Sequence, residues 1–289
     1  MEKISFSKMS GAGNDFILID KNVNPLIVLS QDLIKKLCDR HFGIGADGII
    51  TISNSRNFDF DMEYFNADGS TGSLCGNGAR CAIKFADQSG RIKQKQTRFL
   101  SNNVAYSGEV LTKNEIKFYF NPPKDLKDNL RITLKDQIIN AYFADTGSPH
   151  VVIKIEDVLK NKNNPKSYYT DLNDFPVFEI GREIRYHSDF MPAGTNVNFI
   201  KLLDNKIYIR TYERGVENET LACGTGSTAA ALIGNLIFHL NPPISLITFG
   251  GDKLEVNFKV HNQKVEDLSL TGPAEIIYNG EISLKYLTK

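Results

Sequence analysis

Two cysteines of this 289-residue chain lie in segments that read alike. Residues 64–82 read YFNADGSTGSLCGNGARCA and residues 212–230 read YERGVENETLACGTGSTAA, and the two align without a gap. The alignment pairs Cys75 with Cys223, each followed by Gly-x-Gly. Two thiols at equivalent positions suit proton transfer across a plane: a base removes a proton from carbon and an acid on the other side returns one, inverting the stereocentre. The free enzyme would then hold one thiolate and one thiol, with coupled titrations.

The elements around each cysteine indicate how such thiols would be positioned. In both copies an extended, half-apolar run precedes a polar loop, and the cysteine and its glycines open a helical run of small residues. Each thiol is therefore predicted at a helix N-terminus, where N–H groups and the helix dipole favour a thiolate or a bound carboxylate. Two such ends facing one another would hold both thiols around one small anion. The alternative is two small buried hydrophobic residues, but both cysteines lie outside the predicted helix bodies.

The other two cysteines have a packing explanation. Cys38 lies on the apolar face of a predicted helix that Ser30 caps and that stops near Gly43. Cys81 lies inside the helix predicted over residues 79–90. The sequence has no Cys-x-x-Cys pair and no histidines at zinc spacing. We expect the cysteines to be reduced thiols.

Polar loop residues give further candidates. Asn14, in MSGAGND, is either a turn residue or a ligand for the substrate, and Asn196, in PAGTNVNFI, corresponds loosely to it. His150 precedes an apolar strand and is either a buried structural histidine or a site residue. Glu213 and Arg214 follow a strand, where a charged pair is usually a solvated face. Beside a cysteine loop, this pair can instead bind the ammonium and carboxylate groups of an amino acid.

Strands predominate in both halves. Apolar alternation predicts strands such as FILID and FDMEYFN and a further one in IYIRTYERG, with hairpins turning at residues 204–205 and 279–280. Helices are predicted over residues 79–90, 179–190 and 226–240. The alanines of the last helix would allow sheet to surround it closely.

The composition restricts the kinds of partner that the protein is expected to bind. Acidic and basic residues number 34 each, so no basic field exists to hold nucleic acid or an anionic membrane. No apolar run approaches the roughly 20 residues of a membrane helix, and MEKISFSK lacks the apolar core of a signal peptide. We expect a cytoplasmic protein whose partner is a small molecule. Length and duplication predict two domains, with a boundary at the Asn-Pro-Pro of residues 121–123.

On these residues the chain resembles diaminopimelate epimerase from end to end. The motifs are FSKMSGAGNDF at residues 6–16, FNADGS through CGNGARC at residues 65–81, and YERGVENETLACGTG at residues 212–226. Several long motifs in order are far more specific than a lone glycine-rich loop. Proline racemases and isomerases of the phenazine pathway share the fold, but NADGS and YERG favour the diaminopimelate enzyme.

The resemblance implies an α+β fold of two pseudo-symmetric domains, each a mixed, mostly antiparallel sheet curled around a central helix. One domain would be residues 1–121 plus 273–289 with Cys75, and the other residues 122–272 with Cys223, with the active site in the cleft between them. It also implies interconversion of LL-2,6- and meso-2,6-diaminopimelate in lysine and peptidoglycan precursor synthesis, without pyridoxal phosphate, metal or another cofactor. Such enzymes are commonly homodimers.

The resemblance also implies residue roles. Cys75 matches the family's proton donor and Cys223 its proton acceptor for the LL substrate. Backbone groups that hold the reacting carboxylate match Gly76, Asn77, Gly224 and Thr225. Polar positions that recognise the amino and carboxyl groups, several at the distal centre, match Asn14, Asn66, Asn196, Glu213 and Arg214. His150 and Glu213 match positions important for activity, and Tyr278 matches a tyrosine of the dimer contact.

Two positions depart from the family pattern. Gly48 stands where some members carry a glutamine ligand, so only its backbone could take that role. Ser148 stands in Gly-Ser-Pro-His where many members read Gly-Asn-Pro-His. A serine reaches less far than an amide, so distal binding would then use water.

Two other functions compete with this interpretation. One is a racemase or epimerase for another amino acid, such as a proline derivative, although its substrate would have no distal end for Glu213 and Arg214 to bind. The other is a catalytically silent amino-acid-binding or redox protein, whose working state would be a Cys75–Cys223 disulfide.

Overall fold

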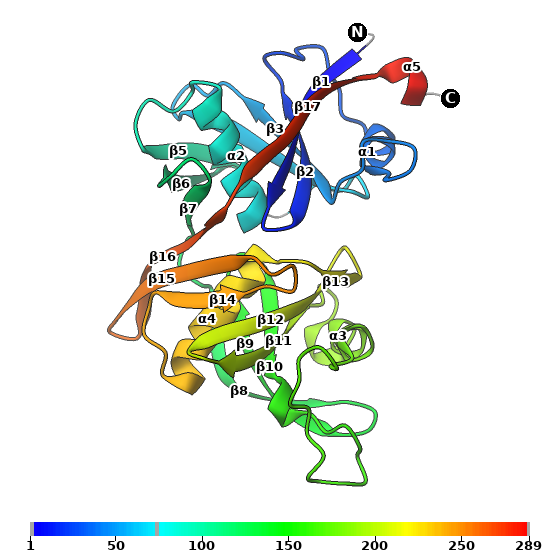
Figure 1. Ribbon diagram of the computed structural model, residues 1–289, viewed down its shortest axis with the longest axis vertical. Coiled ribbons are helices and arrows are strands. Elements are labelled where there is room, and N and C mark those ends of the chain that lie inside the picture. The colour runs from blue at the N-terminus through cyan, green and yellow to red at the C-terminus, as the bar shows by residue number, and fades with distance from the viewer. Residues whose placement is uncertain (1–2, 73–74, 288–289) are drawn as a thin grey trace. The chain divides into compact units, whose positions relative to one another are not determined.

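The computed structural model describes residues 3–72 and 75–287. The chain divides into two compact units: unit 1 is Met1–Tyr119 with Thr271–Lys289, and unit 2 is Phe120–Leu270. The sequence predicts boundaries after residue 121 and before residue 273, and the assignment of an epimerase domain to each unit stays a prediction. In unit 1 the first and last strands of the chain pair side by side (Figure 1).

Unit 1 is a mixed sheet with a helix against it. Its strands are β1 (Lys3–Gly11), β2 (Asn14–Asp20), β3 (Gly48–Ser53), β4 (Phe60–Asn66), β5 (Gln96–Ser101), β6 (Val104–Val110), β7 (Glu115–Tyr119) and β17 (Glu275–Ser283). Its helices are α1 (Gln31–Cys38), α2 (Gly76–Gln88) and α5 (Leu284–Leu287). The strands pair in the order β17, β1, β2, β3, β4, β5, β6, β7. The pairs β2/β3 and β4/β5 are parallel, and the others are antiparallel.

Unit 2 has a sheet of the same kind. Its strands are β8 (Asp125–Thr133), β9 (Ile138–Asp145), β10 (Pro149–Lys154), β11 (Asn196–Leu203), β12 (Lys206–Glu213), β13 (Asn218–Thr220), β14 (Ile244–Ile247) and β15 (Lys253–His261), followed by β16 (Lys264–Pro273), which crosses the unit boundary. Its helices are α3 (Val177–Arg185) and α4 (Gly224–Phe238), with the 3-10 turns η1 (Ile155–Asp157) and η2 (Ser188–Phe190). The strands pair in the order β8, β9, β10, β11, β12, β14, β15, and β13 also pairs with β12. Here β10/β11 and β12/β14 are the parallel pairs.

The two units repeat one topology. In each, an antiparallel pair leads through a helix to a parallel strand, as β1–β2–α1–β3 in unit 1 and β9–β10–α3–β11 in unit 2. An antiparallel strand and a second helix then lead to another parallel strand, as β4–α2–β5 and β12–α4–β14. The duplication seen around the cysteines therefore extends over most of each unit.

The helices α2 and α4 are the central helices of their units. The helix α2 contacts β1, β2, β3, β4, β6, β7 and β17, and α4 contacts β8, β9, β10, β11, β12, β14 and β15. Ala229, Ala230 and Ala231 of α4 are fully buried, because small side chains let strands approach the helix on every side. This confirms the α+β fold predicted from the sequence.

Each unit has its own apolar core. In unit 1, Ile17 of β2 and Ile49 of β3 pack with Ile34 and Leu37 of α1. The helix α1 begins where predicted, because Ser30 Oγ accepts a hydrogen bond from Leu33 N at 3.2 Å. In unit 2, a separate cluster joins β10, β11 and β12 to α3.

One predicted hairpin is wrong. Instead of turning at residues 279–280, β17 runs straight through and pairs with β1, placing Asn279 opposite Ser7 and Gly280 opposite Phe6. Ser7 Oγ donates to Asn279 Oδ1 at 2.6 Å. A Cβ at Gly280 would lie 2.9 Å from the Phe6 ring, so this glycine makes room for a cross-strand aromatic residue.

Other elements differ in part from the prediction. The strands β8 and β16 are not anticipated, because much of each is polar and exposed and gives no clean apolar alternation. The helix predicted over residues 179–190 ends at Arg185, and the turn Ser188–Phe190 follows separately. The hairpin predicted at residues 204–205 is confirmed, since β11 and β12 pair across it and both turn residues have positive φ.

Candidate active site

Cys75 and Cys223 occupy the same place in the two units. Each is the N-cap residue, with extended backbone, of the central helix of its unit. The prediction of a thiol at each helix N-terminus is thus confirmed. The first intrahelical bonds run from Ala79 N–H to Cys75 O and from Ser227 N–H to Cys223 O, both at 2.8 Å. The amides before them, including those of Gly76 and Gly224, point out of the helix ends, where they stabilise negative charge on a neighbouring sulfur or carboxylate.

In unit 1, Cys75 lies beside the side-chain oxygen of Asn14. Cys75 Sγ donates to Asn14 Oδ1 at 3.5 Å, and Asn77 Nδ2 donates to the same oxygen at 3.4 Å. Asn14 begins β2 and is 9% exposed, while Asn77 lies in the first turn of α2 and is fully buried. The amide of Asn14 therefore faces the thiol rather than serving only the loop.

Arg80 and Asp47 join this group without having been singled out from the sequence. Fully buried Arg80 donates from Nη2 to Asn77 Oδ1 at 3.1 Å and from Nη1 to Gly76 O at 3.4 Å. Asp47 accepts a hydrogen bond from Asn14 Nδ2 at 2.6 Å. Arg80 lies inside the CGNGARC motif and Asp47 inside GIGADG, but a motif does not say which of its residues contact one another.

Asn66 occupies the end of β4. Its side chain donates from Nδ2 to Ser70 Oγ at 3.0 Å, and its backbone N–H bonds to Ser70 O at 2.9 Å. Asp68 in turn accepts from Ser70 Oγ at 2.6 Å. The loop NADGS thus forms a closed turn that carries Asn66.

In unit 2, Cys223 lies beside a hydroxyl group. Cys223 Sγ and Thr225 Oγ1 are 3.5 Å apart, both in buried residues. Thr225 Oγ1 also lies 2.9 Å from His150 Nε2 and 3.4 Å from Ser148 Oγ. His150 is therefore brought into the group around the second cysteine.

The surroundings of His150 determine where its proton sits. Asn198 Nδ2 donates to Val151 O at 3.0 Å, and its Oδ1 accepts from Thr211 Oγ1 at 3.0 Å, so the amide orientation is fixed. The same Nδ2, 3.1 Å from His150 Nδ1, must donate to that nitrogen. The proton of neutral His150 is then on Nε2, facing Ser148 and Thr225.

His150 is fully buried and stays neutral. Burial, followed by the charge of Arg214, lowers the pKa of His150 to about 3. Its Nε2–H can therefore donate to Thr225 Oγ1, and that hydroxyl keeps its own proton to donate toward Cys223 Sγ. A hydrogen bond of this direction favours a thiolate at Cys223, whereas the Asn14 oxygen favours a protonated thiol at Cys75.

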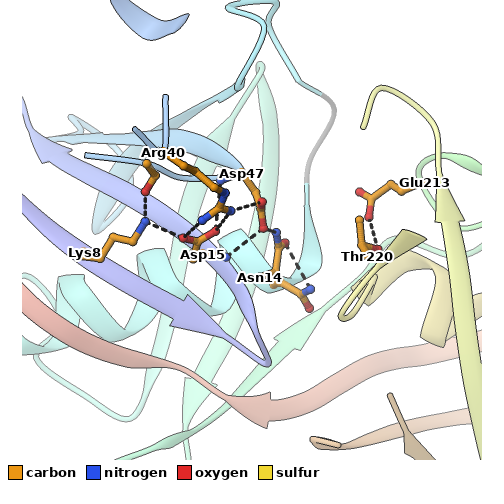
Figure 2. Close-up of polar contacts among 9 residues, drawn as sticks. Lys8, Asn14, Asp15, Arg40, Asp47, Glu213 and Thr220 are labelled. Atoms are coloured by element: carbon orange, nitrogen blue, oxygen red, sulfur yellow. Dashed lines mark hydrogen bonds and ion pairs between the residues drawn. The ribbon is translucent and has the colours of Figure 1, made fainter. Parts of the chain in front are cut away.

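The remaining polar candidates lie around the start of β11 and the end of β12. Asn196 Nδ2 donates to Pro149 O at 2.9 Å, and its Oδ1 accepts from Arg214 N at 2.9 Å. Arg214 Nη1 donates to Ala193 O at 3.2 Å, and burial lowers the pKa of this guanidinium. Glu213 Oε2 accepts from Thr220 Oγ1 at 2.9 Å (Figure 2).

The loose correspondence of Asn196 with Asn14 is wrong. Asn14 begins β2, which the repeated topology matches with β10, whereas Asn196 begins β11 and matches the start of β3. Within unit 2, the residue paired with Asn196 across the parallel strands is His150. Strand order, which short motifs do not report, decides this match.

The structure also shows the surroundings of Gly48 and Ser148, the two residues that depart from the family pattern. A Cβ at Gly48 would lie 2.5 Å from Phe65 O and 2.7 Å from the Tyr64 ring, so the strands leave no room for a side chain there. Ser148, 9% exposed, turns its hydroxyl toward His150 Nε2 at 3.0 Å and Asn196 Nδ2 at 3.5 Å. Its polar group belongs to the cluster around His150.

Cys38 and Cys81 are packing residues, as predicted. Cys38 lies in the unit 1 core, and Cys81 is fully buried in α2. Burial raises the pKa of each thiol to about 12. Both therefore stay protonated in neutral solution.

The predicted dimer tyrosine is partly exposed, and the described residues contain neither a membrane-spanning helix nor a group arranged to hold a metal ion. Tyr278 of β17 is 46% exposed and meets the Phe6 ring edge-on at 6.1 Å. No helix in the described part of the chain is long and apolar enough to cross a membrane. Among residues 3–72 and 75–287 there is also no cluster of three histidine, cysteine or acidic side chains arranged to hold a metal ion.

Comparison with known proteins decides the family. The family model for diaminopimelate epimerase matches residues 6–123 and 142–277. This chain belongs to the diaminopimelate epimerase family. The diaminopimelate epimerase of Chlorobaculum tepidum is 39% identical over 96% of this chain and 100% of its own length. That of Aquifex aeolicus is 36% identical over 98% and 99% of the two chains. Membership in this family makes the protein an isomerase of the epimerase type.

Solved structures with low sequence identity share the fold. A probable proline racemase from Agrobacterium radiobacter has a TM-score of 0.71 at 13% identity, covering 97% of this chain and 93% of that one. A phenazine biosynthesis protein of the PhzF family from Bacillus anthracis has a TM-score of 0.69 at 14% identity, covering 98% and 99%. These likenesses extend the architecture beyond the family.

Proposed function

We propose that this chain interconverts LL- and meso-diaminopimelate by moving a proton at one α-carbon between Cys75 and Cys223, using side chains and backbone alone. Family membership supports the substrate. The observation that carries the mechanism is the opposite character of the two sulfur neighbours, an amide oxygen beside Cys75 and a proton-bearing hydroxyl beside Cys223. The product would enter lysine and peptidoglycan precursor synthesis.

In the LL to meso direction, the Cys223 thiolate takes the α-proton and becomes a thiol. The electron pair left on carbon spreads into the adjacent carboxylate, and the Cys75 S–H then gives its proton to the opposite face of that carbon. The reverse reaction exchanges the roles. No atom is gained or lost, and the enzyme ends with the opposite distribution of one proton between its sulfurs.

The difficult step is the formation of the carbanion, because an α-proton beside a carboxylate is only weakly acidic. The amides at the starts of α2 and α4, from Gly76, Asn77, Gly224 and Thr225, are the donors we assign to the reacting carboxylate. Donors fixed before the reaction stabilise developing charge without reorganising, most strongly when water is excluded. We therefore infer that the units close on the substrate.

The other end of diaminopimelate needs recognition of a second amino group and a second carboxylate. We assign Asn66, Asn196, Glu213 and Arg214 to this distal centre, with Asn14 beside the reacting one. Arg214 supplies a planar cation for a carboxylate, and Glu213 an anion for an ammonium group.

The test is proton exchange at carbon. With LL-diaminopimelate in deuterium oxide, the wild-type protein should form meso product that carries deuterium at one α-carbon. Cys75→Ala and Cys223→Ala should each lose about 10²- to 10⁴-fold in rate, the usual contribution of a general acid or base. Cys38→Ala removes a thiol from the core and is the matched control, which should keep the exchange rate.

Two results would overturn the proposal. Absence of deuterium from the product, or near-normal turnover by either catalytic variant, would rule out two-thiol exchange. Proline and 4-hydroxyproline serve as comparison substrates, and turnover of either in preference to diaminopimelate would move the protein to another substrate class.

The family resemblance also leads us to propose a homodimer with Tyr278 at the contact. Tyr278 and Ile277 are exposed on β17, at 46% and 56%. Light scattering should give the mass of two chains for the wild type and a concentration-dependent fall for Tyr278→Asp. A monomeric wild type would refute this part alone.

A further inference from the structure

Asn14 is held from behind by a carboxylate. Asp47, in the loop before β3, accepts from Asn14 Nδ2 at 2.6 Å and from Asp15 N at 3.2 Å through the same oxygen, Oδ2 (Figure 2). Its other oxygen, Oδ1, accepts from Arg40 Nη2 at 2.7 Å. Both oxygens of Asp47 are thus occupied by donors.

These contacts fix the orientation of the Asn14 amide. An ionised carboxylate can only accept, so Asn14 must turn its NH₂ group toward Asp47 and its oxygen away from it. On that other side lie Cys75 Sγ and Asn77 Nδ2. Asn77 is oriented independently, because Arg80 donates to Asn77 Oδ1 and leaves the NH₂ group of Asn77 facing Asn14. Two separate constraints therefore agree that an acceptor faces the thiol.

The direction of this amide matters for the sulfur. A carboxamide oxygen accepts the S–H of a thiol but repels a thiolate, whereas a reversed amide would present N–H groups and favour the thiolate. The helix N-terminus beside Cys75 also favours a thiolate. Since Cys75 and Cys223 share that helix-end environment, their protonation states must be distinguished by their side-chain neighbours.

We propose that Asp47 is a positioning residue that holds Asn14 so that Cys75 rests as the protonated thiol. This inference rests on the proposed proton exchange between Cys75 and Cys223. Asp47 acts through its hydrogen bond to Asn14. It sets which thiol is the acid when the LL substrate arrives.

Asp47 belongs to a small network of charged side chains. Arg40 also donates to Asp15 from Nη1 at 3.1 Å and from Nη2 at 2.8 Å, and Lys8 Nζ lies 2.6 Å from Asp15 Oδ2. Burial alone would raise the pKa of Asp15, but hydrogen bonds from Arg40 and Lys8 outweigh it and leave the pKa below its ordinary value. Burial, followed by the charge of Asp15, raises the pKa of Asp47. The two cations balance the two carboxylates, with Lys8 on β1, Asp15 on β2 and Arg40 after α1.

Asp47→Asn is the sharpest test, because it keeps the shape and reverses the hydrogen bond. Arg40 still requires an acceptor, so the new amide turns its oxygen to Arg40 and its NH₂ group to Asn14. Asn14 then meets amide donors on both sides, from position 47 and from Asn77 Nδ2. Its oxygen is drawn away from Cys75 toward position 47, and its N–H groups turn toward the sulfur. We expect kcat/KM to fall about 10- to 100-fold, by analogy with residues that orient metal ligands. The alkaline limb of its pH profile should move to lower pH, because Cys75 then loses its proton more readily.

Direct titration separates this inference from the proposed function. In a Cys223→Ala background, thiolate absorbance near neutral pH should report Cys75, since burial raises the pKa values of Cys38 and Cys81 to about 12 and keeps both thiols protonated there. Asp47→Asn should make the thiolate form at lower pH in that background, whether or not diaminopimelate is the substrate. Failure of wild-type deuterium exchange refutes the proposed function, while an unmoved thiol titration refutes the role of Asp47.

Two further variants exclude simpler explanations. Arg40→Gln removes ion pairs with Asp15 and Asp47 but leaves the carboxylate on Asn14, so the alkaline limb should stay in place. A purely electrostatic effect would move the alkaline limb in opposite directions in the two variants, because Asp47→Asn removes a negative charge and Arg40→Gln a positive one. A shift to higher pH in Arg40→Gln, as large as the shift to lower pH in Asp47→Asn, would therefore overturn the inference. Asp47→Glu keeps an acceptor and should restore most of the wild-type profile.

If Asp47→Asn does not fold, the wild type still decides the matter. The Asn14 side-chain NH₂ resonances should be protected from solvent exchange and should shift as Asp47 is titrated. Rapid exchange of these protons would show that the amide is not held, and the inference would fail.

Discussion

At the scale of residues, the two cysteines share a backbone position and differ in their neighbours. Both cap a central helix with extended backbone, so the helix end gives each the same preference for negative charge. Cys75 donates a hydrogen bond to the oxygen of Asn14. Cys223 lies beside the hydroxyl of Thr225, which accepts a hydrogen bond from His150 Nε2–H. An acid and a base can thus be made from one residue type through the choice of neighbour.

A substitution of Thr225 can test this difference at Cys223, the proposed base. Thr225→Val keeps the side-chain shape and the backbone amide but removes the hydroxyl, so the Cys223 thiolate loses a donor. We expect kcat/KM to fall about 10- to 100-fold, as for other residues that tune a reactive group, and its acid limb to move to higher pH. Thr225→Ser should restore both, as measured by epimerisation across a pH series.

The control for this variant lies one turn along the same helix. Thr228 is fully buried and donates to Gly224 O at 2.9 Å. Thr228→Val should cost about 1 kcal/mol of stability, as for one buried hydrogen bond, and should leave the pH profile unchanged. A shift of the acid limb in Thr228→Val as large as that in Thr225→Val would argue against the role of Thr225.

The sequence predicts where the two candidate cysteines lie better than it predicts which residues surround them. The positions of Cys75 and Cys223 follow from a local duplication and a helix start, both of which a short window contains. Asp47 and Asn198 lie 33 residues after Asn14 and 48 after His150, respectively, and their contacts depend on how parallel strands align. Local patterns carry no information on that alignment, so their roles become visible only in the fold.

At the scale of elements, the equivalent helices α2 and α4 are packed differently in their units. Gly78 of α2 and Gly226 of α4 are equivalent in the duplicated motif. A Cβ at Gly226 would lie 2.3 Å from Asn198 Oδ1, whereas one at Gly78 would lie 3.3 Å from the flexible end of Ile50. The helix α4 is thus seated closely on β11, against the amide that orients His150.

This difference predicts unequal effects of one substitution. Alanine in a helix gains roughly 1 kcal/mol over glycine, and overpacking of a core costs about 1–3 kcal/mol. Gly226→Ala should therefore be net destabilising, by up to about 2 kcal/mol, and should lower activity by displacing Asn198. Gly78→Ala should be nearly neutral in urea unfolding. Equal stabilities of the two variants would contradict the close packing of α4.

Elements with local signals are those that the sequence predicts. Ser30 caps α1 and the Asp204–Asn205 turn joins β11 to β12 because the residues that form these features are neighbours in sequence. Asn279–Gly280 carries the same turn signal, yet the pairing with β1, at the other end of the chain, holds it extended. Long-range pairing overrides the local preference there.

At the scale of the whole molecule, the two units have separate apolar cores, so a single free energy of unfolding does not describe the protein. Their buried ionisable groups also differ. Unit 2 contains His150, whose pKa burial lowers to about 3, while unit 1 contains Asp15, whose pKa lies below its ordinary value. The two units should therefore respond to acid over different ranges of pH.

The sign of the response follows from proton binding. Between pH 6.5 and pH 5 the unfolded chain protonates His150, but the folded unit 2 does not, so acid favours unfolding. Over this range unit 2 should lose about 1.5 kcal/mol from this one residue. The contribution of Asp15 is lost only as the pH falls below about 3.8, and the raised pKa of Asp47 makes acid stabilise unit 1.

Hydrogen exchange read by mass spectrometry should resolve this difference, because it assigns protection to segments of each unit. Between pH 6.5 and pH 5, after correction for intrinsic exchange rates, the core strands β10 and β11 should lose protection while β2 and β3 keep theirs. In His150→Gln the unit 2 core is weaker from the outset but should lose its extra dependence on pH, so the slopes are compared rather than the absolute values. Parallel loss in both units, or an unchanged slope in His150→Gln, would mean that a group other than His150 controls the acid response.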